Sequence, residues 1–401
     1  MQRKHWGKTS YDVVIVGGLG HVGLPLGLVF TQKGLTVCLY DLDLKKAAMV
    51  KKGALPFMEY GAETILKEAL KRGRLFISSD MKCVSTAAYV VIAIGTPVDE
   101  HLTPKTRLFL EEVEKLKKFL KPKQTIIVRS TVYPHTCRQM LKILGEHKPW
   151  RIAYCPERIV QGYAVKEIRE LPQIVAGLTQ EAQDKAAQLF RSVCSKIIKT
   201  SMGEAELVKL FSNAWRYAQF AVTNQFYMIA DNFGVDYNKV RQAMREGYER
   251  AATLPSAGFA GGPCLLKDTM QLAAFSSNNF ILGHAAMMVN EGLPNFIVER
   301  LRKKYDLAKM KVGILGMAFK ADSDDIRDSL SYKLGKILRF HGATVFYSDE
   351  YAKDKTFVSK EKLLKESDII IIAVGHAAYK GLEIPAKKEV VDLWGITRKK
   401  K

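Results

Sequence analysis

Residues 13–23 read VVIVGGLGHVG, a β-branched apolar run that leads directly into a glycine-rich turn. Such a run is typical of a strand that is buried on both faces of a parallel sheet. Gly18, Gly20 and Gly23 follow the spacing G-x-G-x-x-G, and a helix-like segment continues to about Gly34. Glycines at these positions let backbone N–H groups approach a dinucleotide pyrophosphate at the positive end of a helix, so the stretch predicts a Rossmann-like unit.

An acidic residue follows this motif where a dinucleotide site needs one. Residues 35–40 are expected to form the next strand, and Asp41 ends it, roughly 20 residues after the glycines. A carboxylate there accepts hydrogen bonds from ribose hydroxyls and repels a 2′-phosphate, which predicts NAD as the cofactor. The alternative is that the glycines serve only a tight turn. Lys46 could reach a cofactor phosphate or ribose, or could be an ordinary surface lysine.

The rest of the chain predicts an α/β protein with two Rossmann-like, doubly wound domains joined by a long-helix central domain. Residues 89–94 and 124–129 are two further buried strands of the first unit. Residues 204–233 lack Gly and Pro and place apolar side chains at helical spacing, which predicts a long helix. Residues 311–316 and 367–375 repeat the strand-then-glycine pattern without the third glycine. We expect an NAD-binding domain over 11–200, a central helical domain over 201–305 and a C-terminal domain over 306–397.

The composition is that of an ordinary globular protein. The chain has 401 residues, 47% hydrophobic and 26% charged, and a formal net charge of +21. The positive excess is spread along the chain, so it favours anionic ligands and gives only a weak argument for nucleic-acid binding. The six cysteines and eight histidines are scattered without disulfide or metal-ligand spacing, so we expect reduced thiols and no metal site.

One stretch of the sequence could be mistaken for a targeting or membrane segment. Arg3, Lys4 and Lys8 precede apolar residues over 13–30, the order found in a signal peptide. Pro25 and the regular glycine spacing argue against a signal peptide and against a membrane helix. We therefore expect a cytoplasmic protein with no membrane and no nucleic acid as a partner.

A second glycine-rich segment, PSAGFAGGPC over 255–264, ends in Cys264 and is followed closely by Lys267 and Asp268. Glycines let backbone and ligand come close, and a thiolate beside a lysine is stabilised and nucleophilic near neutral pH. On composition alone, a buried and inert cysteine in a turn is the simpler interpretation. The other five cysteines are expected to be core residues.

Three further residues have a chemistry that the pattern alone leaves open. Lys209 and Asn213 stand at i and i+4 on one face of the expected long helix, as in any polar stripe. Glu157 follows another expected strand, at the edge where α/β proteins gather ligands, and is equally explained as a surface charge.

Taken in order, these segments resemble the UDP-glucose/GDP-mannose dehydrogenase family of NAD-dependent nucleotide-sugar 6-dehydrogenases. The resemblance runs from Val13 to about Trp394 through GGLGHVG, DLDLKK, IGTPVDEHLTP, RSTVYP, CPERIVQG, AELVKLFSN, GFAGGPCLLKD and GMAFKADSDDIRDS. It implies a four-electron oxidation of a nucleotide sugar at C6, from alcohol to carboxylate, with NAD as the acceptor. It also implies a UDP-sugar substrate, a homodimer or higher homo-oligomer, and a role in making surface-polysaccharide precursors.

The resemblance implies a covalent route in which Cys264 adds to the intermediate aldehyde and forms a thiohemiacetal. Loss of the second hydride would leave a thioester, which water cleaves. Lys209 would stabilise developing oxyanions, and Asn213 would donate a second hydrogen bond. The other catalytic residues that it implies are Asp268 and Thr131 for the water and Glu157 for proton transfer.

Binding residues are implied by the resemblance as well. Lys320 and Arg327 would bind phosphates, and Arg250 would reach the substrate of a neighbouring subunit. The implied cofactor-binding residues are Gly18, Gly20, Gly23, Asp41, Lys46, Thr96, Lys267 and Arg327. The implied substrate-binding residues are Arg158, Arg250, Gly258, Phe259, Gly261 and Lys320.

One departure from the family pattern bears on the substrate. UDP-glucose enzymes usually show P-E-F-L-x-E-G, whereas residues 156–162 here read PERIVQG. Gln161 replaces the second glutamate, so no acid–base role is carried over to that position. Arg158 in place of Phe looks more like the branch that acts on UDP-N-acetylmannosamine or UDP-N-acetylglucosamine. We expect an acetamido sugar, with UDP-glucose as the alternative.

Two other classes of function remain as alternatives. A two-electron hydroxyacid dehydrogenase would share the Rossmann core and would have no need of Cys264 in a glycine-rich loop. A non-catalytic nucleotide-binding or nucleic-acid-binding protein is motivated only by the net charge of +21. The number of NADH molecules formed per substrate separates the four-electron dehydrogenase from the two-electron hydroxyacid dehydrogenase. Salt-sensitive DNA binding without turnover would indicate the non-catalytic protein.

Overall fold

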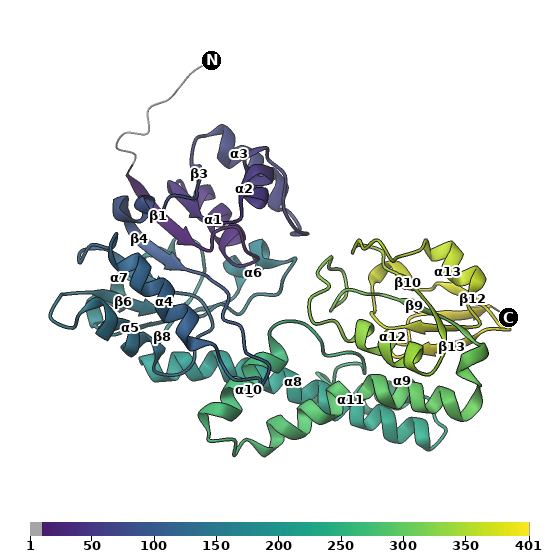
Figure 1. Ribbon diagram of the computed structural model, residues 1–401. Helices are drawn as coiled ribbons and strands as arrows, with labels where there is room; N and C mark the ends of the chain where they lie inside the picture. The colour runs from purple at the N-terminus through teal and green to yellow at the C-terminus, as the bar shows by residue number, and fades with distance from the viewer. Residues whose placement is uncertain (1–9, 401) are drawn as a thin grey trace. The chain divides into compact units, whose positions relative to one another are not determined.

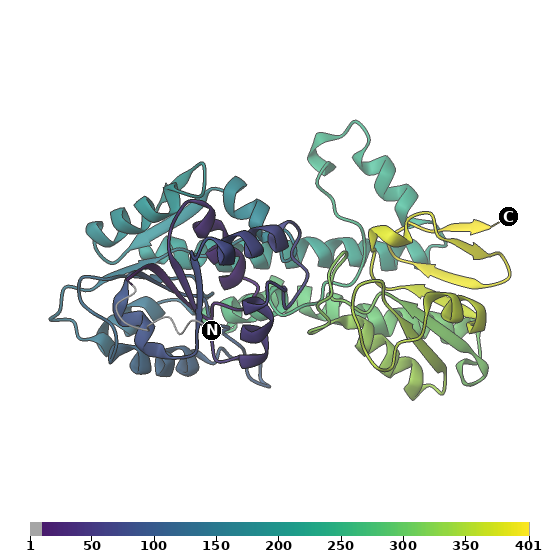
Figure 2. The same ribbon diagram turned by 90° about the horizontal axis from the view of Figure 1, so that it is seen from above.

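The structure is a computed structural model that describes residues 10–400 (Figures 1 and 2). These residues form two compact units, the first ending at Phe211 and the second beginning at Ser212. Helix α8 (Met202–Asn232) contains this boundary and confirms the long helix predicted over 204–233. Gly234 follows the helix end with φ +82°, a left-handed conformation that glycine adopts without steric cost.

The first unit is built on an eight-stranded sheet in the order β3-β2-β1-β4-β5-β6-β7-β8. Neighbouring strands are parallel except β6 and β7. The strands are β1 (Tyr11–Val16), β2 (Val37–Tyr40), β3 (Leu75–Ser78), β4 (Ala87–Ile92), β5 (Thr125–Val128), β6 (Arg151–Tyr154), β7 (Gln173–Gly177) and β8 (Ile197–Lys199). This is the strand order of a doubly wound dinucleotide-binding domain, so the predicted fold class is confirmed.

Helices cover both faces of this sheet (Figure 1). They are α1 (Gly23–Gln32), α2 (Leu44–Lys51), α3 (Ala62–Lys71), α4 (Thr106–Lys117), α5 (Thr136–Leu144), α6 (Ala164–Glu170) and α7 (Gln180–Arg191), with a 3₁₀ helix at Met81–Thr86. Along β1, Val13 and Ile15 enter the core shared with α1 and α3, while Val14 and Val16 enter the core shared with α4 and α5. Burial on two faces is why the strand is apolar without alternation.

The apolar stretch over 13–30 is therefore a strand, a turn and a helix. Within residues 10–400, no helix has the length and apolar character needed to cross a membrane. The basic residues Arg3, Lys4 and Lys8 lie outside the described residues.

The second unit carries a four-stranded parallel sheet in the order β10-β9-β11-β13, and a separate pair of β12 and β14. The strands are β9 (Lys311–Leu315), β10 (Thr344–Ser348), β11 (Ile369–Ile372), β12 (Glu383–Pro385), β13 (Glu389–Asp392) and β14 (Arg398–Lys400). The order β10-β9-β11 repeats β2-β1-β4 of the first sheet, which confirms the predicted internal similarity.

The second unit contains the end of α8, helix α10, which begins directly after Cys264, and helices that cover the small sheet. Besides α8, its helices are α9 (Tyr237–Arg245), α10 (Leu265–Phe275), α11 (Ile281–Lys304), α12 (Leu330–Phe340) and α13 (Lys360–Glu366), with 3₁₀ helices at Glu249–Ala251, Leu307–Lys309 and Ala377–Tyr379. Ile314 and Leu315 of β9 enter different apolar clusters, so this sheet too is buried on both faces. The domain limits 11–200, 201–305 and 306–397 stay predictions.

Candidate active site

In the glycine turn after β1, two glycines are required by close packing of the protein and the third faces open space. A Cβ atom on Gly18 would lie 2.7 Å from the Leu39 Cβ, and one on Gly23 would lie 2.4 Å from the Gly17 carbonyl oxygen. The protein's own backbone therefore requires glycine at both positions. A Cβ on Gly20 would meet nothing closer than the Gly17 oxygen at 3.5 Å. Space is thus left beside Gly20 for a group outside the chain.

Asp41 follows β2 and holds this turn in place. Its Oδ2 accepts a hydrogen bond from the Leu19 N–H at 3.0 Å, and its Oδ1 accepts one from the Asp43 N–H at 3.0 Å. A carboxylate has about four acceptor positions, so capacity remains for ribose hydroxyls. The turn, the open space at Gly20 and the acid together fit an NAD adenosine and pyrophosphate.

Lys46 lies on α2, where its ammonium forms an ion pair with Asp43 at 3.6 Å. Asp43 also caps α2 by accepting the Lys46 N–H at 2.9 Å, and this hydrogen bond lowers the pKa of the carboxyl group. Both side chains are 40% exposed. The contacts agree with the surface-lysine interpretation, and a cofactor role for Lys46 stays a prediction.

Gly20→Ala tests the cofactor assignment. We expect NAD affinity to fall by about tenfold, comparable to the loss of one hydrogen bond to a charged group, because the new methyl group faces ligand and not protein. The melting temperature should stay at the wild-type value. Gly23→Ala is the matched control and should lower the melting temperature, since its Cβ meets backbone. Calorimetric NAD titration and thermal unfolding measure the two effects; unchanged NAD affinity in Gly20→Ala would contradict the assignment.

The loops that follow β4 and β5 are bound to each other. The Thr96 hydroxyl donates to the Thr131 carbonyl oxygen at 2.6 Å, and the Ser130 hydroxyl donates to the Ile94 carbonyl oxygen at 2.7 Å. The structure thus brings Thr96 and Thr131 together at the carboxyl ends of the parallel strands, where doubly wound folds bind ligands.

Lys209 and Glu157 form a buried ion pair in the first unit. The Lys209 Nζ lies 3.3 Å from Glu157 Oε1, and the two side chains are 6% and 13% exposed. The Glu157 Oε2 is buried and, among the described residues, has no hydrogen-bond partner. This burial excludes the interpretation of Glu157 as a surface charge and of Lys209 as part of an ordinary exposed polar stripe. A buried carboxylate oxygen without a partner calls for a ligand or a water molecule.

The segment that carries Glu157 is fixed by a residue that the sequence did not single out. Glu59 is buried, and its carboxylate accepts hydrogen bonds from the Gly162 N–H at 3.1 Å and the Val165 N–H at 3.0 Å. No local motif marks a contact between residues so far apart in the chain. Arg158 donates to the Pro172 carbonyl oxygen at 2.6 Å, so part of its hydrogen-bonding capacity serves this segment.

Cys264 lies in the second unit, at the end of a loop that we call the cysteine loop, residues 255–264, and at the N-cap of α10. Its side chain is exposed. The other cysteines are half-buried at Cys83 and buried at Cys38, Cys137, Cys155 and Cys194. Exposure excludes the interpretation of Cys264 as an inert core thiol.

The glycines of the cysteine loop are required by close packing. A Cβ on Gly258 would lie 2.4 Å from the Trp394 ring, one on Gly261 would lie 2.8 Å from the Asp328 oxygen, and one on Gly262 would lie 2.3 Å from the Phe319 ring. Phe259 is only 5% exposed and belongs to the core of this unit. The sequence did not single out Asn224 of α8. Its Nδ2 donates to the Gly258 carbonyl oxygen at 3.0 Å, and its Oδ1 accepts the Gly258 N–H at 2.9 Å.

Asp268 stands one turn into α10, where its N–H donates to the Cys264 carbonyl oxygen at 2.9 Å. Its carboxylate is 1% exposed. It accepts a hydrogen bond from Asn213 Nδ2 at 2.5 Å and forms an ion pair with Lys267. The structure therefore brings Asn213, Lys267 and Asp268 together next to the cysteine. Lys267 is engaged by Asp268, and its contact with a cofactor or substrate stays a prediction.

Arg327 lies near the cysteine as well. Its guanidinium binds the Asp325 carboxylate at 2.6–3.1 Å, and these hydrogen bonds raise its pKa, with a smaller contribution from the charge of Cys264. A nearby arginine stabilises a thiolate. The resemblance placed Arg327 among the phosphate- and cofactor-binding residues and did not indicate that it lies near the cysteine.

Two other candidates for substrate binding lie on loops of the second unit. Lys320 follows β9 and is half-buried, with Nζ 3.4 Å from the Ala321 carbonyl oxygen. Arg250 is exposed and lies over the Tyr248 ring, 5.7 Å from its centre. Lys209 in the first unit and Asn213 in the second are one turn apart on α8.

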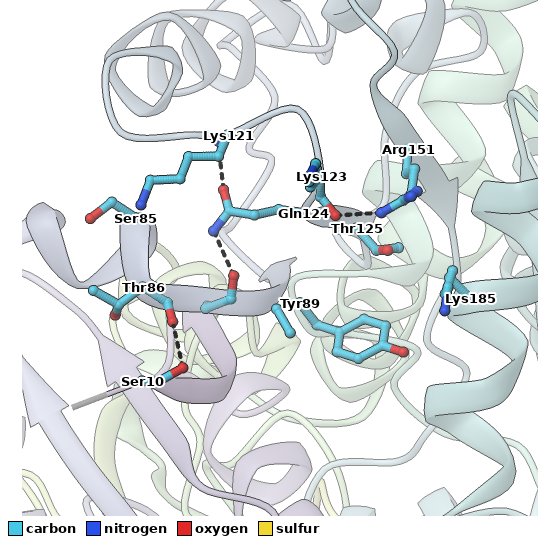
Figure 3. Close-up of a pocket in the computed structure, with 12 residues that line it drawn as sticks. Ser10, Ser85, Thr86, Tyr89, Lys121, Lys123, Gln124, Thr125, Arg151 and Lys185 are labelled. Carbon is cyan, nitrogen blue, oxygen red and sulfur yellow. Dashed lines mark hydrogen bonds between the residues drawn. The ribbon is translucent and has the colours of Figure 1, made fainter. Parts of the chain in front are cut away.

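A cavity of about 580 Å³ lies elsewhere in the first unit, beside the amino ends of β4, β5 and β6 (Figure 3). Its lining includes Lys121, Lys123, Arg151 and Lys185. Ligands of doubly wound sheets bind at the opposite, carboxyl ends of the strands. None of the expected site residues lines this cavity, so it is separate from the candidate active site.

Comparison with known proteins gives a match over most of the chain. Residues 12–194 match the NAD binding domain of the UDP-glucose/GDP-mannose dehydrogenase family, residues 203–291 its central domain, and residues 313–399 its UDP binding domain.

Individual relatives are distant in sequence and similar in fold. A UDP-N-acetyl-D-mannosamine dehydrogenase of Pyrococcus horikoshii is 28% identical over 382 residues, 92% of this chain and 90% of the relative. The solved structure of a UDP-D-ManNAc dehydrogenase from that organism has a TM-score of 0.86 at 26% identity and covers 96% of each chain. That of a UDP-glucose dehydrogenase from Pyrobaculum islandicum has a TM-score of 0.88 at 25% identity and covers 98% of this chain and 96% of that one.

Proposed function

Because this chain belongs to the UDP-glucose/GDP-mannose dehydrogenase family, we propose that it oxidises the C6 alcohol of a UDP-sugar to a carboxylate in two successive NAD-dependent steps. The observation that carries the four-electron reaction is the exposed Cys264 at the start of α10, beside Arg327 and one turn before the buried Asp268. A two-electron alcohol oxidation needs no thiol of this kind.

NAD, when bound, supplies the acceptor for the hydride that leaves C6 in each oxidation. An aldehyde carbon cannot give a second hydride and become an acid directly, so a nucleophile must first make it tetrahedral. The Cys264 Sγ bonds to the aldehyde carbon, the proton goes to the carbonyl oxygen, and a thiohemiacetal results. Loss of hydride from that carbon and of the hydroxyl proton leaves a thioester. Water adds to the thioester, the C–S bond breaks, and the thiol and the carboxylic acid are released.

The charged groups of the site suit these steps. Lys209 provides a desolvated positive charge for the oxyanions that develop on O6, where the low dielectric strengthens the interaction. Glu157, with one unpartnered carboxylate oxygen, accepts and returns protons. Asn213 and Lys267 orient the Asp268 carboxylate, to which we assign the hydrolytic water, a role that the resemblance also gives to Thr131.

Binding of the two nucleotides falls to residues of different domains. Gly18, Gly20, Gly23, Asp41 and Thr96 hold NAD, with Lys46 at the edge. The UDP-sugar is bound by Arg158, Gly258, Phe259, Gly261 and Lys320, with Arg250 donated to a neighbouring subunit. Lys267 and Arg327 are assigned to the cofactor.

The sugar is proposed to be UDP-N-acetylmannosamine or UDP-N-acetylglucosamine. The support is Arg158 in place of the phenylalanine of UDP-glucose enzymes, and the name UDP-N-acetyl-D-mannosamine dehydrogenase on relatives that align over nine-tenths of the chain. UDP-glucose is the second candidate, favoured by the high structural similarity to a UDP-glucose dehydrogenase.

Assaying NADH release with UDP-N-acetylmannosamine, UDP-N-acetylglucosamine, UDP-glucose and GDP-mannose tests the proposal. We expect kcat/KM for one acetamido sugar to exceed that for UDP-glucose by tenfold or more, about the discrimination of one hydrogen-bonded contact. Preference for UDP-glucose would refute the sugar assignment and keep the reaction class. No turnover of any of the four would refute the function itself.

A homodimer or higher homo-oligomer is proposed, and an exposed apolar stripe on α8 supports association of copies of the chain. Trp215, Val222 and Ile229 of α8 are 65%, 48% and 57% exposed and recur every seven residues, so they form one apolar stripe along the helix. A second copy of the chain would cover it. The cytoplasmic location stays a proposal that rests on the sequence, and the supply of surface-polysaccharide precursors stays one that rests on the family.

A further inference from the structure

The second sheet contains a buried acid at the position that Asp41 has in the first sheet. Asp349 follows β10 and its side chain is fully buried. Its Oδ2 accepts the Met317 N–H at 2.6 Å and the Ala318 N–H at 2.9 Å. Two more N–H groups, of Tyr351 and Ala352, donate to its Oδ1 at 2.8 Å each. Asp41 keeps acceptor positions for a ligand, whereas the carboxylate oxygens of Asp349 accept their hydrogen bonds from groups of the protein itself.

His376, which follows β11, completes this arrangement. Its ring is fully buried, with Nε2 3.1 Å from Asp349 Oδ2. Its Nδ1 accepts the Asp322 N–H at 2.9 Å, so Nδ1 carries no proton and Nε2 donates to Asp349. Burial by itself works to raise the pKa of Asp349, but the hydrogen bonds from His376 and from backbone N–H groups outweigh burial and lower the pKa of this carboxyl group.

The same imidazole fixes a strained backbone. Asp322 has φ +51°, a left-handed conformation that side chains other than glycine rarely adopt. Its N–H is held by His376, and its Oδ1 accepts the Ala377 N–H at 2.9 Å. Strain of this kind persists only where the surroundings determine it, and it is concentrated at functional sites. Residues 317–322, which we call the β9 loop, are therefore tied at both ends, by Asp349 at the start and His376 at the finish.

The β9 loop supports the cysteine loop directly. It carries Lys320, and it carries Phe319, whose ring lies against Gly262, two residues before Cys264. The strand end that bears His376 makes a second contact, because a Cβ on its neighbour Gly375 would lie 2.9 Å from the Trp394 ring, and that ring also packs on Gly258. Both aromatic supports of the cysteine loop thus depend on the segments that His376 joins.

We infer that His376 is a positioning residue for the proposed reaction: by bridging Asp349 and Asp322 it sets the β9 loop, and with it the phosphate-binding Lys320 and the seat of Cys264. The inference rests on the proposed function. An apolar side chain at this position would remove the side-chain donor of the buried Asp349 and leave the Asp322 N–H without the acceptor that holds it, and the loop would relax.

His376→Ala, His376→Gln and the control His341→Ala test the inference on the full chain. In His376→Ala we expect UDP affinity, measured by calorimetry, to fall by about tenfold or more, as for the loss of a hydrogen bond to a charged group. NAD affinity should stay unchanged. NADH formed per UDP-sugar should fall from two toward one, because a displaced Cys264 lets the aldehyde escape.

The two other variants separate positioning from folding. The glutamine in His376→Gln can still donate to Asp349, so it should recover UDP affinity to within about threefold of wild type and restore the ratio of two NADH per UDP-sugar. His341, half-buried beside Phe340 at the end of α12, should be replaceable without any change.

Three results overturn the inference. The first is wild-type UDP affinity in His376→Ala together with two NADH formed per UDP-sugar. The second is an equal loss of UDP and NAD affinity in that variant. The third is a His376→Gln variant whose UDP affinity stays as low as that of His376→Ala. If the wild-type enzyme itself forms one NADH per sugar, the proposed function fails. The UDP affinities then still decide whether His376 positions the β9 loop.

Discussion

Cys264→Ser should lower the rate of acid formation by roughly 10³-fold or more, the size seen when a covalent nucleophile is removed. A serine hydroxyl is a far weaker nucleophile than a thiolate near neutral pH, and no other group at the start of α10 can replace it. The first oxidation does not need the sulfur, so the sugar aldehyde should appear with at most one NADH per molecule. NAD and UDP affinities should stay at wild-type values, because the exposed side chain does not carry the packing of its loop.

Cys83→Ser provides the matched control, since Cys83 is half-buried and lies outside every proposed site. It should keep wild-type acid formation. Acid formation by Cys264→Ser at the wild-type rate would show that the nucleophile is misassigned. Quantifying aldehyde and acid by mass spectrometry distinguishes a block at the second oxidation from a general loss of activity.

Lys209→Ala should reduce kcat by about 10²–10³-fold, the effect of removing one donor to a developing oxyanion. The ammonium is only 6% exposed, so water screens its charge little when negative charge develops on the substrate. Because that charge is present mainly in the transition state, KM for the sugar and the affinity for NAD should change little. Steady-state kinetics and NAD titration measure the two separately.

Lys199→Ala is the comparison for Lys209→Ala, since Lys199 forms its ion pair with Asp184 at the surface. It should keep wild-type kcat, as exposed ion pairs contribute little. Thermal unfolding of Lys209→Ala checks that the unpaired Glu157 has not unfolded the domain. A folded Lys209→Ala variant with unchanged kcat would exclude the oxyanion role.

The fold was predictable because its signals are local. Four β-branched residues before a glycine turn predict a strand buried on both faces, and Val13 to Val16 are buried in alternation on two sides of the first sheet. The glycine spacing predicts the turn, and two of its three glycines are required by backbone contacts at Gly18 and Gly23. Residues 204–233 predict α8 to within two residues at its start and one at its end.

The site was predictable only in part, because its contacts join distant segments. Nothing in the sequence near Glu59 indicates that it holds the backbone of residues 162–165. The same is true of His376, whose two partners stand 27 and 54 residues away. The burial of Lys209 with Glu157 also follows from tertiary packing, so a helical pattern could not distinguish it from a polar stripe.

The number of NADH molecules formed per UDP-sugar consumed, measured at completion with limiting sugar, tests the covalent four-electron reaction most directly. Capture of the aldehyde by Cys264 predicts two NADH per sugar, with the carboxylate as the only product. One NADH per sugar, with the aldehyde released by the wild-type enzyme, would contradict it.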